Sequence, residues 1–235
     1  MLPCSVSFSR LSYRVKLILF LLGAIAVLFL VDTAYQGLNT LSRLNVVEAE
    51  RDQWQRPSDV IQALDLRPGN VVVDLGCGSG YFTLKISAPV GPSGRVLAED
   101  IRRLPLVFLW VRTFQKGQRN VIIVHGEPDD PHLPTQGVNA VLVANTYHEF
   151  TNSQVILIHV FRSLVSGGRL VVVDRQPQVT EQGSGNTARE HHEVSPDQVE
   201  KELRQAGFEI VGRKDRFIEN DPSNEKWWLI TARKP

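Results

Sequence analysis

The stretch "VVVDLGCGSGYFTLKIS", Val71–Ser87, decides the fold of this chain. It begins with an apolar run typical of a buried strand, passes through a turn rich in glycine, and continues as a segment that can open a helix. Glycines at such a turn let the backbone adopt conformations that other residues avoid and let a ligand approach closely. The stretch therefore predicts a strand, a ligand-binding turn and a helix in succession.

Short apolar runs recur after this stretch, separated by segments with helical spacing: residues 95–100, 120–126, 139–146 and 169–174. Runs of Val, Ile and Leu that alternate with helices are typical of strands buried on both faces of a parallel sheet. The C-terminal part differs, because a helix is followed by two strands, which favours an antiparallel hairpin at the sheet edge. The pattern predicts an α/β fold with a mostly parallel sheet.

Composition bounds the size and the partners of the chain. Its 235 residues suffice for one domain with a full core and an appendage. The 26 basic and 25 acidic residues are mixed along the sequence, so no positive field is available to hold nucleic acid, and we expect no nucleic-acid partner. The two cysteines, Cys4 and Cys77, lack the spacing of a disulfide framework or a zinc site.

An apolar run near the N-terminus, Leu17–Val31, approaches the length of about 20 residues that crosses a bilayer as a helix. A cleaved signal peptide is the alternative, but Asp32 stands where a small residue should precede Ala34 at a cleavage site. We predict a single-pass membrane protein. Its expected organisation is a tail at 1–14, a transmembrane helix or signal anchor at 15–35, a connector at 36–50 and a globular domain at 51–235.

The glycine turn departs from two common phosphate-binding motifs. The dinucleotide motif Gly-x-Gly-x-x-Gly needs its third glycine one position after Gly80, and a P-loop needs a lysine earlier than Lys85. An acid, Asp74, stands near the end of the preceding strand. A carboxylate beside the ligand suits a cation better than a pyrophosphate. NAD and simple phosphate capture are therefore disfavoured.

The same residues carry a resemblance to a known family. "VVVDLGCGSGYFT" resembles the first motif of class I S-adenosylmethionine-dependent methyltransferases, and the order of elements from about Arg51 to Lys234 matches that fold. Together with "EPDDPHLP" and "NTYHEF", the region is similar to a group of bacterial methyltransferase-domain proteins. The resemblance implies S-adenosylmethionine as cofactor and a Rossmann-like, seven-stranded sheet with an antiparallel last strand.

The resemblance also assigns residues to the methionine and ribose parts of the cofactor. Asp74 would organise the amino group, directly or through water. Asp100, at the end of the 95–100 run, would accept hydrogen bonds from both ribose hydroxyls, with Glu99 as the alternative. The residues that would pass under the methionine part are Gly76, Gly78 and Gly80.

Further assignments concern the adenine end and the cover of the site. Either Asp129 or Asp130 would meet the adenine amino group. Trp54 and Gln55 would cover the cofactor, although packing explains these two residues nearly as well.

Residues 145–148, which include Asn145, would line the opening where the methyl group is presented. Because a sulfonium already makes its methyl group electrophilic, the protein mainly has to align the acceptor. If the acceptor carries a proton, His148 is the expected general base, with Tyr147 orienting the acceptor and Glu149 orienting the histidine. A histidine that only caps the next helix is the alternative.

The polar, glycine-containing stretch 176–192 is typical of a mobile loop. His191, His192 and Glu193 lie at its end and suggest a metal site together with His148. Their spacing matches no known metal-ligand pattern, so we expect no metal.

The segment Leu104–Phe114 predicts a helix that is apolar on more than one face. The residues expected to pack on the sheet are Leu104, Val107, Phe108 and Val111. The remaining apolar residues are Leu106, Leu109, Trp110 and Phe114, and basic residues flank the segment. Apolar bulk with a basic border is typical of an interfacial helix, whereas burial by neighbours or by a dimer partner is the plainer interpretation.

The sequence therefore favours a membrane-anchored methyltransferase that acts on a small or lipid-like acceptor. The alternatives are an anchored cofactor-binding scaffold without turnover and, less favoured, a nucleotide-dependent oxidoreductase. Arg10, Arg14 and Lys16 precede the span without an acid, so the positive-inside rule would carry the domain out of the cytoplasm. A domain outside the cytoplasm conflicts with a cofactor made inside the cell, so the sequence does not decide which side of the membrane carries the domain. It does not indicate the oligomeric state either.

Overall fold

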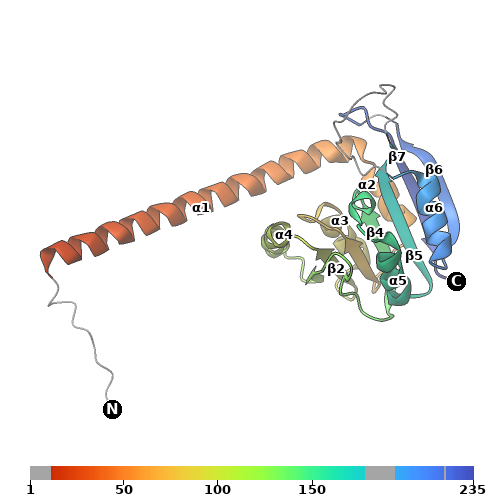
Figure 1. Cartoon of the computed structure of the whole chain (residues 1–235), viewed down its shortest axis with the longest axis horizontal. Coiled ribbons are helices and arrows are strands. Elements are labelled where there is room, and N and C mark those ends of the chain that lie inside the picture. Colours follow the sequence, from red (N-terminus) through yellow and green to blue (C-terminus); the bar gives the residue numbers. More distant parts are fainter. Residues whose placement is uncertain (1–11, 178–193, 220) are drawn as a thin grey trace, which may run out of the picture. The chain divides into compact units, whose positions relative to one another are not determined.

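The computed structural model describes residues 12–177, 194–219 and 221–235 (Figure 1). The chain divides into two compact units, Met1–Val47 and Glu48–Pro235. The first holds most of a long helix, and the second holds the sheet with the helices that cover it.

Helix α1, Tyr13–Trp54, contains both the predicted span and the predicted connector. An 18-residue window of this helix has a mean hydropathy of 2.6, and none of that window is buried within the protein. The helix is long and apolar enough to cross a membrane. Residues 36–50, expected as a connector, are helical too, and residues 48–54 belong to the globular unit.

Seven strands form one sheet in the order β3-β2-β1-β4-β5-β7-β6. Their bounds are β1 Val71–Leu75, β2 Arg95–Asp100, β3 Val121–His125, β4 Val138–Ala144, β5 Leu164–Arg175, β6 Glu209–Ile218 and β7 Trp227–Arg233. Neighbouring strands from β3 through β5 are parallel, whereas β7 is antiparallel to both β5 and β6. The predicted sheet with an antiparallel last strand is confirmed.

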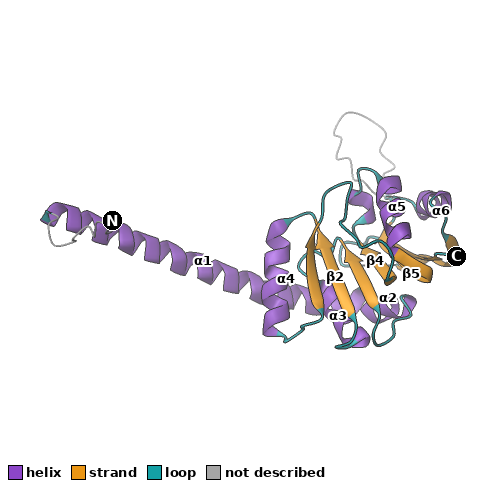
Figure 2. Ribbon diagram, turned by 90° about the horizontal axis from the view of Figure 1, so that it is seen from below, coloured by secondary structure: helices purple, strands orange, loops and turns teal. Residues whose placement is uncertain are grey.

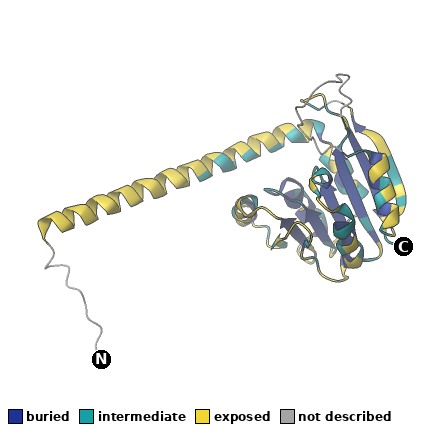
Figure 3. Cartoon of the chain, viewed as in Figure 1, coloured by how far each residue is buried: buried dark blue, intermediate teal, exposed yellow. Residues whose placement is uncertain are grey.

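Helices cover both faces of this sheet (Figure 2). One face carries α2 Pro57–Ala63, α3 Tyr81–Val90 and α4 Arg103–Gln115, and the other carries α5 Ser153–Ser163 and α6 Pro196–Gln205. Consecutive residues of one strand serve both cores, since Val72 packs with α2 and α3 while Val73 packs with α5 and α6. The inner strands β2, β1, β4, β5 and β7 are therefore mostly buried (Figure 3), whereas the edge strands β3 and β6 are largely half-buried or exposed.

The strand order locates the ligand site. β2 and β3 lie on one side of β1, and β4 and β5 lie on the other, so the chain reverses its direction of winding between β1 and β4. In open parallel sheets, ligands bind beyond the carboxyl ends of the strands at such a switch point. The loops after β1, β2, β4 and β5 meet at this edge, called the carboxyl edge below.

Helix α4 forms as expected but turns a different face to the sheet. Leu106 and Leu109 are buried, whereas Leu104 and Val107, expected to pack on the sheet, are exposed. The expectation was wrong for these two residues, whereas Phe108 and Val111 are half-buried. Because the segment is apolar on several faces, the spacing of apolar residues alone does not determine which face is buried.

A polar residue determines the buried face of α4. Arg112 is buried, and its guanidinium donates to the Ser79 carbonyl at 2.5 Å and to the Glu48 carboxylate at 2.7 Å. On the same face, Leu109 lies very close to Gly80. A Cβ added to Gly80 would be 2.3 Å from Cδ1 of Leu109. These contacts set the rotation of the helix about its axis.

Candidate functional site at the carboxyl edge

The glycine turn between β1 and α3 comes very close to the loop after β4. Gly76, Gly78 and Gly80 have φ angles of 73°, 55° and 91°, which other residues rarely adopt. A Cβ at Gly76 would lie only 2.2 Å from Cγ2 of Thr146. The turn therefore requires glycine for its conformation and, at Gly76, for the approach of the β4 loop.

Three carboxyl groups surround this turn. Asp74, on β1, is buried and accepts a hydrogen bond from the Thr83 hydroxyl at 2.6 Å. Asp100, the last residue of β2, accepts hydrogen bonds from the amides of Gly78 at 2.9 Å and Arg102 at 2.8 Å. The adjacent Glu99 is buried as well. Such a cluster of carboxyl groups favours a ligand that brings positive charge or hydrogen-bond donors.

Burial and mutual repulsion raise the pKa values of two of these acids. Desolvation, with the neighbouring carboxyls adding to it, raises the pKa of Glu99 to about 8. Burial raises the pKa of Asp74 to about 6, again with a contribution from Asp100. A ligand that brings positive charge or hydrogen-bond donors would relieve this cost. Burial also raises the pKa of the Cys77 thiol, which makes Cys77 a poor nucleophile.

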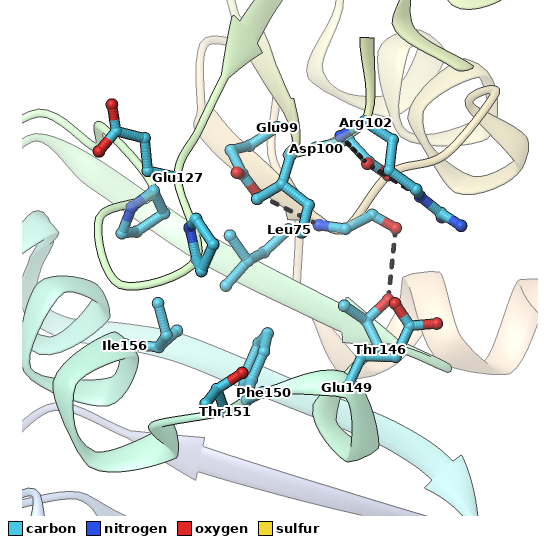
Figure 4. A pocket seen from close by; sticks show the side chains of 14 residues that line it. Leu75, Glu99, Asp100, Arg102, Glu127, Thr146, Glu149, Phe150, Thr151 and Ile156 are labelled. Carbon is cyan, nitrogen blue, oxygen red and sulfur yellow. Dashed lines mark hydrogen bonds and ion pairs between the residues drawn. The ribbon is translucent and has the colours of Figure 1, made fainter. Parts of the chain in front are cut away.

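A cavity of about 150 Å³ lies beside the turn (Figure 4). Glu99, Asp100 and Arg102 lie on one side of it, and Thr146 and Glu149 lie on the other. Its apolar lining consists of Leu75, Ile101, Pro128, Pro131, Phe150 and Ile156. Asp100, which is predicted to bind the ribose, and its alternative Glu99 therefore both line the cavity.

The residues predicted to meet adenine, Asp129 and Asp130, do not line this cavity. The backbones of Glu127 and Asp130 exchange hydrogen bonds of 2.8 and 3.1 Å, which closes a tight turn. Asp129 is exposed at its tip, and the Asp130 carboxylate accepts a hydrogen bond from the His132 amide at 2.9 Å. Glu127 and Pro128 of the same loop line the cavity instead.

Asn145 follows β4 in a left-handed backbone conformation, with φ at 56°. Its amide donates to the Val173 carbonyl at 2.7 Å, which holds the loop against the end of β5. Its side-chain oxygen is buried and has no hydrogen-bond partner among the described residues. A buried acceptor without a donor is costly. This oxygen is thus a candidate contact for a bound ligand, at the place where the sequence expects one.

The short 3-10 helix η2, Tyr147–Glu149, places His148 against the end of β5. His148 Nδ1 lies 2.8 Å from Asp174 Oδ1, and the His148 amide donates to Asp174 Oδ2 at 3.1 Å. Arg175 Nη2 lies 3.3 Å from His148 Nε2. A carboxylate only accepts and a guanidinium only donates, so Nδ1 carries the proton and Nε2 presents a lone pair. In this structure that lone pair accepts from Arg175. A base oriented in this way by a buried carboxylate can accept a proton from a bound acceptor that takes the place of Arg175 at Nε2.

The sequence did not reveal Asp174 as the partner of His148. Glu149, expected in that role, is 53% exposed and its carboxylate lies 3.9 Å from His148 Nε2, whereas the Asp174 side chain is fully buried. The expectation about Glu149 is therefore corrected. An acid at the end of the 169–174 run was the available signal, but the pairing of two residues 26 positions apart depends on the adjacency of β4 and β5.

Tyr147 faces away from His148. Its ring packs against Phe150, with centroids 5.2 Å apart, and its hydroxyl donates to Glu202 on α6 at 2.5 Å. Burial, with Glu202 adding to it, raises the pKa of this hydroxyl. The geometry does not support the expected contact between Tyr147 and an acceptor.

The end of α1 and the residue after it belong to the globular unit. Trp54 packs against Trp227, with ring centroids 5.8 Å apart. Gln55 is fully buried and its Oε1 accepts a hydrogen bond from Arg51 Nε at 2.6 Å. Its Nε2 is buried without a partner among the described residues. Packing accounts for Trp54, and Gln55 is buried with one donor unpaired among the described residues.

No group of three His, Cys, Asp or Glu residues that could hold a metal occurs in the described ranges. The sequence suggested a metal site formed by His148 with three further residues, His191, His192 and Glu193. These three residues lie outside the described ranges, as does most of the 176–192 stretch.

The architecture and the carboxyl edge together define a class of protein. The strand order, the glycine turn after β1 and the acid at the end of β2 are those of class I S-adenosylmethionine-dependent methyltransferases. The model of the ubiE/COQ5 methyltransferase family matches residues 26–184, and the chain belongs to that family. This assignment confirms the class and the cofactor, S-adenosylmethionine, that the sequence predicted.

Two curated relatives show the extent of the sequence similarity. The ubiquinone/menaquinone biosynthesis C-methyltransferase UbiE of Ectopseudomonas mendocina is 32% identical over 122 residues, which are 52% of this chain and 47% of the relative. The demethylmenaquinone methyltransferase of Anoxybacillus flavithermus is 23% identical over 121 residues, 52% of this chain and 50% of the relative. The chain spans about half the length of the curated relatives that it matches.

Solved structures extend the similarity of fold. A SAM dependent methyltransferase from Aquifex aeolicus superposes with a TM-score of 0.67 at 21% identity, covering 82% of this chain and 97% of that one. A geranyl diphosphate C-methyltransferase from Streptomyces coelicolor gives a TM-score of 0.65 at 14% identity, with coverages of 77% and 80%.

The residues at the carboxyl edge fit S-adenosylmethionine. The three acids suit a ligand with a sulfonium and an ammonium, the turn at Gly76 keeps backbone close to the cavity, and the Asn145 oxygen is an unpaired buried acceptor among the described residues.

Proposed function

We propose that this chain is a membrane-anchored enzyme that transfers a methyl group from S-adenosylmethionine to a small lipophilic acceptor, with a quinone-like aromatic molecule as the favoured class. The observation that carries the proposal is the His148–Asp174 pair at the edge that also holds the glycine turn and its acids. The names of the relatives, which concern quinone biosynthesis and C-methylation, support the acceptor class. The apolar run of α1 supports a location where such acceptors dissolve.

Of the four residues proposed to hold the cofactor, three line the cavity, and the fourth, Asp74, is buried and does not line it. Asp100, with Glu99 beside it, accepts hydrogen bonds from the ribose, and Glu127 replaces Asp129 and Asp130 as the candidate at the adenine end. Asp74 attracts the ammonium group of the methionine part. When bound, the cofactor supplies an electrophilic methyl group on a sulfonium.

The residues proposed to act on the acceptor lie at the ends of β4 and β5. His148 Nε2 accepts the proton of an aromatic hydroxyl, which makes the neighbouring ring carbon nucleophilic, and Asp174 stabilises the imidazolium that forms. Arg175, which donates to His148 Nε2 at 3.3 Å, would give up that hydrogen bond to the acceptor and donate instead to its negative oxygen. The ring carbon gains the methyl group and loses its hydrogen, so one proton is released per turnover.

The test is transfer of labelled methyl groups by the full chain in membranes, followed by extraction into organic solvent. We expect S-adenosylhomocysteine to form and label to enter a lipophilic, non-protein fraction. His148→Ala should abolish the transfer, whereas His159→Ala, at a partly exposed histidine of α5, should not.

Two results would contradict the proposal. Binding of S-adenosylmethionine without formation of S-adenosylhomocysteine would favour the anchored scaffold. Label in protein or in water-soluble molecules would refute the lipophilic acceptor class.

A further inference from the structure

The outer face of α4 carries an exposed apolar stripe. Leu104, Val107, Trp110 and Phe114 are 66%, 55%, 62% and 80% exposed, and they recur at helical spacing along one side of the helix. The rings of Trp110 and Phe114 are stacked, with centroids 6.4 Å apart. Ile101, 49% exposed, lies just before the helix and lines the cavity. We call these five residues the α4 stripe.

The stripe is not a core surface that happens to be turned outward. The opposite face of α4 already packs on the sheet through Leu106 and Leu109, and Arg112 fixes the rotation of the helix through Glu48 and the Ser79 carbonyl. Burying the stripe in the core would require breaking this buried ion pair. The stripe is therefore a stable feature of the outer surface.

Positive charge borders the stripe. Arg103, Lys116 and Arg119 are exposed and form no ion pair with any described residue, and α4 itself contains no acid. Arg102 is 60% exposed, and its guanidinium contacts the buried Asp100 at 3.3 Å. Aromatic and aliphatic bulk with a cationic rim matches the interface between headgroups and acyl chains of an anionic bilayer.

We propose that the α4 stripe docks on the surface of an anionic lipid bilayer and thereby brings the rim of the cavity to the membrane. The proposal rests on the anchored location proposed above. Residues 36–47, between the apolar run and the globular unit, reach at most about 40 Å even when fully extended, so the domain stays near the bilayer. A second copy of this chain is a less suitable partner for the stripe. In a symmetric dimer, the basic residues around one stripe would face the same basic residues of the other copy.

The test uses the emission of Trp110 in the full chain, reconstituted in nanodiscs of phosphatidylglycerol whose acyl chains are brominated or not. The difference between wild type and Trp110→Phe isolates this residue from the three other tryptophans. We expect the Trp110 emission to be shifted to the blue and quenched by brominated lipid. Replacing Arg103, Lys116 and Arg119 with Gln should reduce the quenching.

A control tryptophan is placed at the opposite edge of the sheet. Val211, 46% exposed on β6, is replaced with Trp in the Trp110→Phe background. Its emission should stay that of a tryptophan in water and respond little to bromination.

Two results would overturn the proposal. Trp110 emission typical of water and insensitive to bromination would show that the stripe does not touch lipid. Emission shifted to the blue but not quenched would show that protein covers it. Neither reading depends on turnover, so a failure here is distinguishable from a failure of labelled methyl transfer.

Discussion

The two halves of the carboxyl edge are built differently. In the half formed by β1 and β2, the glycine turn, Asp74, Glu99 and Asp100 come from a single continuous stretch of about thirty residues, and the motif is visible in the sequence. In the half formed by β4 and β5, His148 meets Asp174 only because the two strands are neighbours. The half proposed to hold the cofactor is thus encoded by local spacing, and the half proposed to act on the acceptor is encoded by tertiary pairing.

The two halves also differ in how their charges are compensated. The first buries three acids side by side, and this burial, with repulsion between the carboxyls adding to it, raises the pKa values of Glu99 and Asp74. The second pairs the acid Asp174 with His148 and places Arg175 beside them. Substitutions in the first half should therefore change cofactor binding and the pH dependence of stability, whereas those in the second should change turnover.

The largest effect is expected for Asp174→Asn. Loss of the carboxylate that orients and stabilises His148 should lower the rate of methyl transfer by about 10²- to 10⁴-fold, while cofactor affinity changes little. Glu149→Gln, a change at the exposed acid, is the matched control and should retain most of the activity. An equal loss of turnover in both variants, with both still folded by circular dichroism, would refute the assignment of Asp174.

The second prediction concerns pH. Because the pKa of Glu99 is raised to about 8 in the folded protein, the native state retains a proton that the unfolded chain releases near its ordinary pKa. This contribution to stability is present at low pH and is lost as the pH rises from 4.5 towards 8, on the order of a few kcal/mol.

Glu99→Gln isolates this effect, since glutamine does not titrate and the smaller contribution of Asp74 remains. Between pH 5 and 8, the melting temperature of wild type should fall relative to that of the variant. Parallel melting curves across this range would show that Glu99 is ionised in the folded protein.

The smallest effect separates the two interpretations of the 127–130 loop. Asp129→Asn should change the affinity for S-adenosylmethionine by less than about 0.5 kcal/mol, as for a surface substitution. Glu127→Gln should weaken it by about 0.5–1.5 kcal/mol, the net value of one hydrogen bond. A larger loss for Asp129→Asn than for Glu127→Gln would restore the adenine contact to Asp129, one of the two residues expected from the sequence.

These differences show what a single sequence could and could not provide. The mostly parallel sheet, the hairpin at its C-terminal edge and the turn at Gly76 were predictable because each depends on local spacing or on period. The buried face of α4 was not, because an ion pair between Arg112 and Glu48 decides among faces that are all apolar. Asp174 was missed for the same reason, since its role depends on a neighbour in space.

The central claim is that one half of the edge binds the cofactor and the other acts on the acceptor. Calorimetric titration of S-adenosylmethionine into the full chain tests it most directly, with Asp100→Ala and His148→Ala compared with wild type. Asp100→Ala should weaken binding by about 1–3 kcal/mol through loss of hydrogen bonds to a charged acceptor, whereas His148→Ala should bind as wild type does. Unchanged binding in Asp100→Ala, or an equal loss in both variants, would contradict the division.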